Sequence, residues 1–279
     1  MTERLAETNR RLASLQQLDA VVTAMRGIAA SRVQQAHGLL PGVRAYAEVV
    51  GGAIGQALAL APSAAPEATN AAHRTAIVLF SAEQGFAGAF SERMLAAITP
   101  LPEAADLFLI GTRGAALVEE RGVRFAWRTP MVPQASLVPV LAERIARALY
   151  AWVTDHAAAR VEMVVPVWSA AGGVGAARRT LLPFDFRRFK VAATGQAPLV
   201  TLPPARLLAQ LAVEYVFSEL CEAACLAFAA ENEARVAAML AAGSNLKDMR
   251  ADLTGLARLL RQAEITAEVV ELASGAAAR

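Results

Sequence analysis

The glycine-rich segment FSAEQGFAGAF (residues 80–90) has the composition of a phosphate-binding turn. Gly85 and Gly88 lie between a β-rich run and a helical pattern, and backbone N–H groups at the start of a helix can bind an anion. The Gly-x-x-Gly spacing lacks the lysine of a P-loop and the third glycine of a dinucleotide fingerprint. The segment therefore favours a tight strand-to-helix turn, and nucleotide or phosphate binding is the alternative.

The other residues that could do chemistry are scattered. The histidines, His37, His73 and His156, have no metal-ligand spacing, and no serine lies in a nucleophile elbow. Cys221 and Cys225 have a spacing that suits no disulfide on a helix, and two thiols alone make a poor zinc site. We interpret both as small apolar side chains. We expect no catalytic residue, no metal and no cofactor.

The elements that must position the glycine turn alternate between strand and helix. Strands are expected at 74–80, 106–111, 123–127 and 161–168, with a weaker one at LLPFDF (181–186). Helices are expected near 112–120 and 137–159, and AGGVG (171–175) is interpreted as a loop. This alternation predicts an α/β fold, a Rossmann-like domain with a mainly parallel sheet over residues 74–200.

Two long helical patterns flank this domain. The first has apolar residues in steps of three and four, at Leu12, Leu15, Leu18, Val22, Met25, Ala29, Val33, Ala36 and Leu40. The second has an apolar seam at Met239, Ala242, Leu246, Met249, Leu253, Leu256, Leu260, Ala263, Ala267 and Val270. We predict a long antiparallel coiled coil of residues 1–60 and 205–279, with a linker at 61–73. Because alanine buries little area, the coil should weaken toward its C-terminal end.

Composition excludes several classes of protein. The 27 basic and 25 acidic residues give a net charge of +2, which is too balanced for a nucleic-acid binder. The charged N-terminus lacks the apolar core of a signal peptide. The uncharged stretch 49–66 contains glycine, proline and much alanine, whereas a membrane span needs about 20 strongly apolar residues. We expect a soluble protein without direct membrane insertion.

Three segments resemble the gamma subunit of F-type ATP synthases. VVTAMRGIAASRV (21–33) is similar to its first-helix signature, and LFSAEQGFAGAFSERM (79–94) to its first strand and glycine turn. LRQAEITAEVVELASGAAA (260–278) resembles its C-terminal signature and is the most specific of the three. The order and distances agree with the family over the whole chain. The turn AEQGFAG and the lysine-free stretch SLQQLDAVVTAM depart from the usual pattern, which favours a divergent or alternative form.

The resemblance implies a function. A gamma subunit is the rotor shaft of the enzyme: its paired helices stand in a ring of alpha and beta subunits, and its α/β domain lies near the epsilon subunit and the membrane ring of c subunits. It would couple rotation driven by protons or sodium ions to the catalytic beta subunits, without being an enzyme itself. It would lie peripherally at the cytoplasmic face of the membrane. The alternatives are an independent phosphate-binding enzyme and an unrelated coiled-coil scaffold.

The same resemblance implies which residues contact partners. Arg261 and Gln262 match the pair that touches a beta-subunit loop, Thr266 and Glu268 belong to the same segment, and Met25 matches the methionine of the first-helix signature. Without the resemblance, each is a surface residue on a solvated helix. Polar contacts suit a turning tip, because their modest net energy allows them to form and break.

Overall fold

The computed structural model describes residues 2–60, 74–156, 159–169, 173–191 and 199–277, so the linker expected at 61–73 lies outside the described residues. The helices are α1 (Thr2–Leu60), α2 (Phe90–Ala96), α3 (Thr112–Glu120), α4 (Val138–Asp155) and α5 (Pro204–Ala277), with short 3-10 helices at Ala135–Leu137 and Phe186–Arg188. The strands are β1 (Arg74–Phe80), β2 (Ala105–Ile110), β3 (Trp127–Thr129), β4 (Ala159–Ser169) and β5 (Gly173–Leu182).

The chain divides into two compact units. The helical unit contains Met1–Ala29 and Val236–Arg279, and the α/β unit contains Ala30–Arg235. The long helices α1 and α5 each contribute residues to both units. The domain limits expected from the sequence, 1–60, 74–200 and 205–279, stay a prediction.

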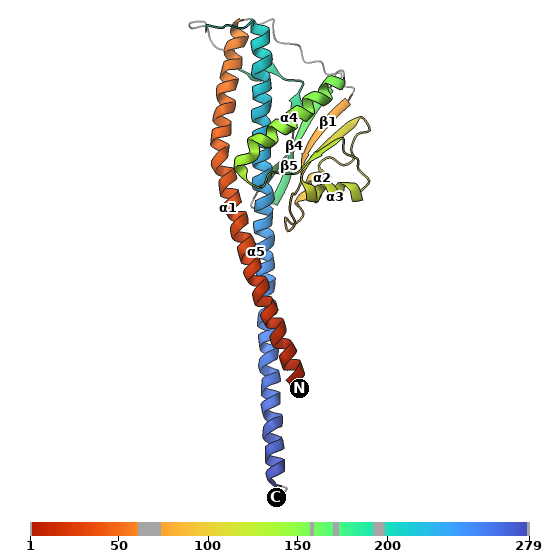
Figure 1. Cartoon of the computed structure of the whole chain (residues 1–279), viewed down its shortest axis with the longest axis vertical. Coiled ribbons are helices and arrows are strands. Elements are labelled where there is room, and N and C mark those ends of the chain that lie inside the picture. The colour runs from red at the N-terminus through yellow and green to blue at the C-terminus, as the bar shows by residue number, and fades with distance from the viewer. Residues whose placement is uncertain (1, 61–73, 157–158, 170–172, 192–198, 278–279) are drawn as a thin grey trace. The chain divides into compact units, whose positions relative to one another are not determined.

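The sheet of the α/β unit has the strand order β3-β2-β1-β4-β5. Figure 1 labels its strands β1, β4 and β5. β1 pairs with β2 and β4 in parallel, and β2 pairs with β3 in parallel. Only the pairing of β4 with β5 is antiparallel among the described strands. The predicted Rossmann-like fold with a mainly parallel sheet is therefore confirmed.

Two strands differ from their expected positions. The third begins at Trp127 instead of 123, because the Val123 amide donates to the Val118 carbonyl and closes the end of α3. The fifth covers 173–182, so the expected loop was wrong at 173–175, and the strand expected at 181–186 was right only at 181 and 182. β5 is an edge strand that starts at Gly173 with a φ of 68°, and an edge tolerates glycines that weaken an interior strand.

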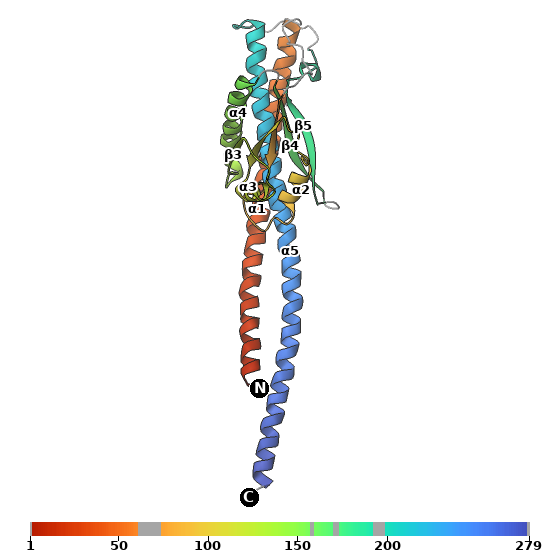
Figure 2. The same ribbon diagram turned by 90° about the vertical axis from the view of Figure 1, so that its right-hand side faces the viewer.

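Helices cover both faces of the sheet (Figure 2). On one face, Val78 and Phe80 belong to a core that includes α4 and parts of α1 and α5. On the other face, Ile77 and Leu79 pack with α2 and α3. Consecutive residues of a strand point to opposite faces, so β1 is buried on both sides and has the continuous apolar sequence that a central parallel strand requires.

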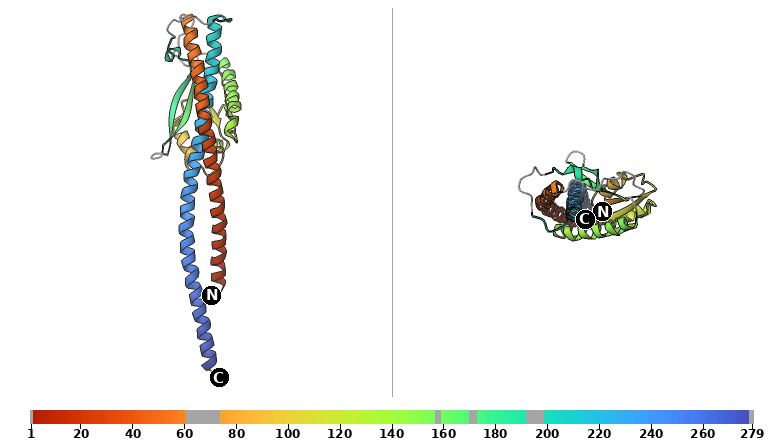
Figure 3. Two further views of the ribbon diagram at one scale, coloured as in Figure 1. Left: turned by 90° about the vertical axis from the view of Figure 1, so that its left-hand side faces the viewer. Right: turned by 90° about the horizontal axis from the view of Figure 1, so that it is seen from above.

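In the helical unit, α1 and α5 lie side by side, and α5 continues beyond the N-terminal end of α1 (Figure 3). Val22 Cγ1 lies 3.9 Å from the position that a Cβ atom would take at Gly243. Most residues of the predicted stripe on α1 are half-buried or buried, but Leu18 is 51% exposed. The predicted antiparallel coil is confirmed, and the Leu18 position is an exception to its seam.

Candidate functional site

The glycine turn, residues 81–89, connects β1 to α2. Phe86 has a φ of 60° and Gly88 a φ of 55°, a left-handed region that glycine adopts readily and a bulky residue does not. Phe86 is 65% exposed. A side chain at Gly85 or Gly88 would meet no atom within 4 Å, so these glycines are not required by a close neighbour. The glycine of this turn that its backbone requires is Gly88.

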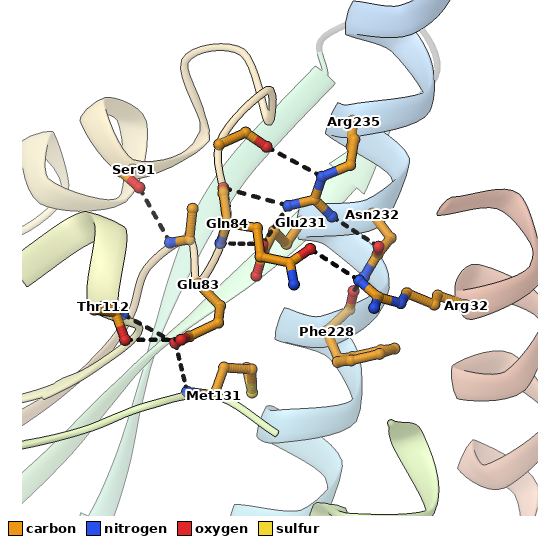
Figure 4. Close-up of polar contacts among 12 residues, drawn as sticks. Arg32, Glu83, Gln84, Ser91, Thr112, Met131, Phe228, Glu231, Asn232 and Arg235 are labelled. Carbon is orange, nitrogen blue, oxygen red and sulfur yellow. Dashed lines mark hydrogen bonds and ion pairs between the residues drawn. The ribbon is translucent and has the colours of Figure 1, made fainter. Parts of the chain in front are cut away.

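A carboxylate of the turn occupies the anion position at the start of α3 (Figure 4). Glu83 accepts hydrogen bonds from the Thr112 amide at 2.9 Å, the Thr112 hydroxyl at 2.7 Å and the Met131 amide at 2.8 Å. The start of a helix favours negative charge, and here the chain supplies that charge itself. This geometry removes the main donor group that a phosphate would use beside the turn.

The turn is held against α5 by a buried group that we call the polar clamp: Glu231, Asn232 and Arg235 (Figure 4). Their exposed fractions are 3%, 2% and 4%. The Arg235 guanidinium pairs with the Glu231 carboxylate and donates to Asn232 Oδ1 at 2.8 Å. The clamp is therefore a compact network in which a buried charge has both an ionic partner and hydrogen bonds, as burial demands.

The clamp also binds the backbone of the turn. Arg235 donates to the carbonyl oxygens of Gly85 at 3.2 Å and Gln84 at 3.3 Å, and the Gln84 amide donates to Glu231 Oε1 at 3.2 Å. From α1, Arg32 donates to Gln84 Oε1 at 3.1 Å. Both long helices therefore contact one short turn within the α/β unit.

Sequence reasoning missed the clamp, although a signal was present. ENEAR (231–235) interrupts an alanine-rich run whose other residues are apolar. On a helix, positions 228, 231, 232 and 235 share one face, and that face also carries Phe228, whose carbonyl accepts from Asn232 at 2.7 Å. Charged residues on the same face as a core aromatic residue indicate a buried network.

The residues predicted to contact partners lie in the helical unit. Arg261, Gln262, Thr266 and Glu268 are exposed on α5. The Thr266 hydroxyl donates to the Gln262 carbonyl at 2.8 Å. Within the described part of the chain, the side chains of Arg261, Gln262 and Glu268 have no hydrogen-bond or ion-pair partner. Their assignment as contact residues stays a prediction.

The same segment exposes large apolar side chains. Ile265 is 55% exposed, Val269 59%, Val270 62% and Leu272 74%, whereas Met239 at the start of the seam is 4% exposed. The predicted weakening of the coil toward its end stays a prediction. Exposed apolar residues gathered on one helix end are typical of a surface that another molecule covers.

Met25 does not join the other predicted contact residues. It is half-buried on α1, and its neighbours Val22 and Arg26 line a hollow of about 310 Å³ together with residues of α5 between Met239 and Arg250. The segment 261–268 lies farther along α5. Two separate positions, and not one site, therefore carry the predicted contacts.

The cysteines are buried, and the described histidines contact neighbouring side chains. Burial raises the pKa of the Cys221 thiol to about 12 and of the Cys225 thiol to about 11, so both are protonated near neutral pH, as expected of apolar fillers. His37 lies 3.1 Å from Glu233, His156 stacks on Trp152, and His73 lies outside the described residues. Among the described residues, no group of three or more His, Cys, Asp or Glu side chains could hold a metal ion.

A search of the described helices for a membrane span finds none with the necessary length and apolarity.

Comparison with protein families and curated proteins identifies relatives over the full chain. The model of the ATP synthase family matches residues 4–278. An ATP synthase gamma chain from Beutenbergia cavernae is 28% identical, with 95% of each chain covered. One from Parafrankia sp. is 27% identical over 99% of this chain and 98% of the relative.

Solved structures share the fold. A chain of the Euglena gracilis mitochondrial ATP synthase, in a structure of OSCP, F1 and the c-ring, has a TM-score of 0.70 at 14% identity, covering 100% of this chain and 95% of that one. A chain from the central stalk and c-ring of the Tetrahymena thermophila mitochondrial ATP synthase has a TM-score of 0.60 at 17% identity, covering 80% and 99%. At these identities the likeness concerns the fold.

Proposed function

This chain belongs to the ATP synthase family as a gamma chain, and we propose that the exposed end of α5 couples its rotation to the catalytic subunits. A gamma chain is the rotor shaft of the complex and a non-catalytic subunit. The chemistry of ATP synthesis or hydrolysis takes place on other subunits. The residues to explain are therefore those that bear on partners.

One observation carries the proposal: along the apolar seam of α5, the exposed fraction rises from 4% at Met239 through 46% at Met249 to 62% at Val270. A scaffold coil needs apolar residues covered by its partner helix to its end. A rotating tip needs a different surface, because firmly packed apolar anchors would hold it at one angle. Small and polar side chains give contacts whose net energy is modest, so they can be exchanged at each angle.

The partners follow from this assignment. Arg261 and Gln262 would touch a loop of a beta subunit, with Thr266 and Glu268 beside them and Met25 contacting the ring of alpha and beta subunits at another position. The α/β unit would face the epsilon subunit and the c-ring. The chain would lie peripherally at the cytoplasmic face of the membrane. The similarity of the whole chain to gamma chains supports these assignments.

Co-expression with alpha and beta subunits encoded beside this chain tests the proposal. The complex is purified on a beta-subunit tag, and the stoichiometry of this chain and the rate of ATP hydrolysis are measured with and without residues 261–279. We expect one copy per ring of alpha and beta subunits and a changed hydrolysis rate after truncation.

A matched variant separates the role of the tip from that of length. Alanine at Arg261 and Gln262 together leaves α5 intact, so a changed rate in that variant assigns the effect to these side chains. Failure of the full chain to co-purify with the alpha and beta subunits would contradict the proposed function. In that case binding of inorganic phosphate, compared between the wild type and Gly88→Val, would test the enzyme alternative.

A further inference from the structure

We propose that the polar clamp, Glu231, Asn232 and Arg235, fixes the rotational register of α5 against the sheet and so determines how much load passes between the α/β unit and the long helix. This inference rests on the proposed function, because it concerns the path of torque through a gamma chain. The three residues are positioning residues, since they would act through the turn and the helix that they connect.

Between residues 223 and 235, beyond the larger buried side chains of Val216 and Leu220, the apolar face of α5 has little shape with which to hold a register. Its buried apolar residues between 223 and 235 are Ala223, Ala224, Cys225, Ala227, Phe228, Ala229, Ala230 and Ala234. Helices resist sliding and rotation when ridges of side chains fit into grooves, and alanine makes shallow ridges. A helix with this face can approach the sheet closely, but apart from Phe228 it has few projections that would resist rotation under load.

The clamp supplies directional contacts that this part of the apolar face lacks. Arg235 donates hydrogen bonds to the Gln84 and Gly85 carbonyl oxygens, 3.3 and 3.2 Å long, and these bonds can form at only one rotational position of α5. A change of register by one residue turns a helix by about 100°, which would carry Arg235 away from both carbonyls. The guanidinium and the Glu231 carboxylate would then be buried without these partners, which is an expensive arrangement.

The turn that the clamp holds is itself anchored to the sheet. Glu83 binds the start of α3 and the Met131 amide, and the Ala82 amide donates to Ser91 Oγ at 3.1 Å (Figure 4). A continuous series of hydrogen bonds therefore leads from α2 and α3 through the turn to α5. The hydrogen bond from Arg32 to Gln84 connects α1 to the same turn.

Other polar contacts of α5 are more exposed. Arg44 on α1 pairs with Glu222, and the Arg44 side chain is 57% exposed. Arg179 on β5 reaches the same Glu222 with its side chain 40% exposed. Exposed ion pairs contribute little because water and salt screen them. The 5% and 4% exposure of the Arg235 and Glu231 side chains distinguishes the clamp as the contact that resists load.

The test uses the whole complex reconstituted in sealed vesicles. ATP hydrolysis and ATP-driven ion pumping are measured together for the wild type and for Arg235→Met. We expect assembly and hydrolysis to be kept within about twofold and the ions pumped per ATP to fall by about threefold or more, which corresponds to a coupling change within the range of about 0.5–2 kcal/mol. An unchanged ratio in an assembled Arg235→Met complex would overturn the proposal.

Three further variants sharpen the result. Arg44→Met removes an arginine side chain from the exposed pair and should leave the ratio at the wild-type value. An equal fall in the ratio would show that any ion pair of α5 produces the effect and would overturn the proposal. Arg235→Lys keeps the charge but loses the planar group that reaches both carbonyls and Asn232, so its ratio should be intermediate. If Arg235→Met does not assemble, Asn232→Ala removes only the amide that orients the guanidinium and should lower the ratio in the same direction.

A measurement on the isolated full chain separates this inference from the proposed function. Amide hydrogen exchange of residues 82–88 should accelerate in Arg235→Met more than in Arg44→Met, because the turn loses its attachment to α5. Unchanged exchange overturns the clamp without affecting the gamma-chain assignment. Conversely, a wild-type chain that neither joins the complex nor supports pumping refutes the proposed function, whatever the exchange shows.

Discussion

The helix α5 carries the same polar side-chain types in two settings. At 231–235 a glutamate, an asparagine and an arginine are buried, and the described contacts satisfy their charges and amide groups. At 261–268 an arginine, a glutamine and a glutamate are exposed, and within the described residues their side chains have no partner. The first group serves the fold of its own chain. The second is available to another molecule.

The roles of the two groups on α5 follow from burial. Residue type does not separate the two groups, because the clamp and the exposed residues Arg261, Gln262 and Glu268 each contain one cation, one amide and one carboxylate. Burial separates them, because a buried charge must be paired at once whereas an exposed charge is solvated until a partner arrives. Substitutions in the first group should therefore change stability together with coupling, and those in the second should leave stability unchanged.

The largest expected effect comes from Arg235→Met in the isolated chain. Removing one member of a buried ion pair leaves the other buried and unpaired, and we expect a loss of about 3–5 kcal/mol in the free energy of unfolding. Arg261→Met should change it by less than about 0.5 kcal/mol. Urea unfolding followed by circular dichroism measures both free energies. Equal losses in the two variants would contradict the view that burial separates the two groups.

The buried thiols give the next largest effect, through pH. Burial raises the pKa of Cys221 to about 12 and of Cys225 to about 11, whereas an unfolded thiol titrates near about 8.5. Below about pH 8.5 both states are protonated and the stabilisation is complete; above it the unfolded state loses protons first, so stability falls as pH rises toward the folded pKa values. We expect a loss of about 2 kcal/mol from pH 8 to pH 10 after allowance for solvent screening.

The double variant Cys221→Ala with Cys225→Ala is the matched control for this pH effect. Its stability should decline less between the same two pH values. A wild type and a double variant with parallel pH profiles would show that other groups cause the decline.

Glu83→Gln is expected to have the smallest effect of the three on stability. Glu83 is half-buried and accepts three hydrogen bonds. The single amide oxygen of glutamine can accept only some of these bonds, and it carries no negative charge. We expect a loss of about 1 kcal/mol, intermediate between the buried clamp and the exposed tip. The midpoint of urea unfolding measures it. Thr112→Val, which removes one donor and leaves the carboxylate charged, should cost less.

Much of the fold could be predicted from the sequence because its signals are local. Continuous apolar runs indicated β1, β2 and β4, and steps of three and four indicated the long helices. β3 was placed too early because Val123 and Phe125 are apolar for another reason: they pack under α3 as part of a loop. β5 was misplaced because its glycines resemble a loop, and an edge position that tolerates them is a property of the sheet.

The two polar groups of α5 differ in the same way. The tip was identified by its resemblance to a family, which local sequence carries. The clamp depends on a contact between Arg235 and Gly85, 150 residues apart, and no periodicity within either segment specifies that meeting. The local sequence does show the polar segment ENEAR among alanines. This pattern indicates a buried polar group but does not identify its partner.

The Thr266 hydroxyl has one proton, and the Gln262 carbonyl already accepts it. What the hydroxyl can still offer is its lone pairs. A group that approaches Thr266 from outside must therefore bring its own hydrogen, as a guanidinium, an ammonium or an amide N–H does, and a carboxylate would find nothing to accept from. At this position α5 therefore favours hydrogen-bond donors over acceptors, because a carbonyl of its own backbone takes the only hydroxyl proton.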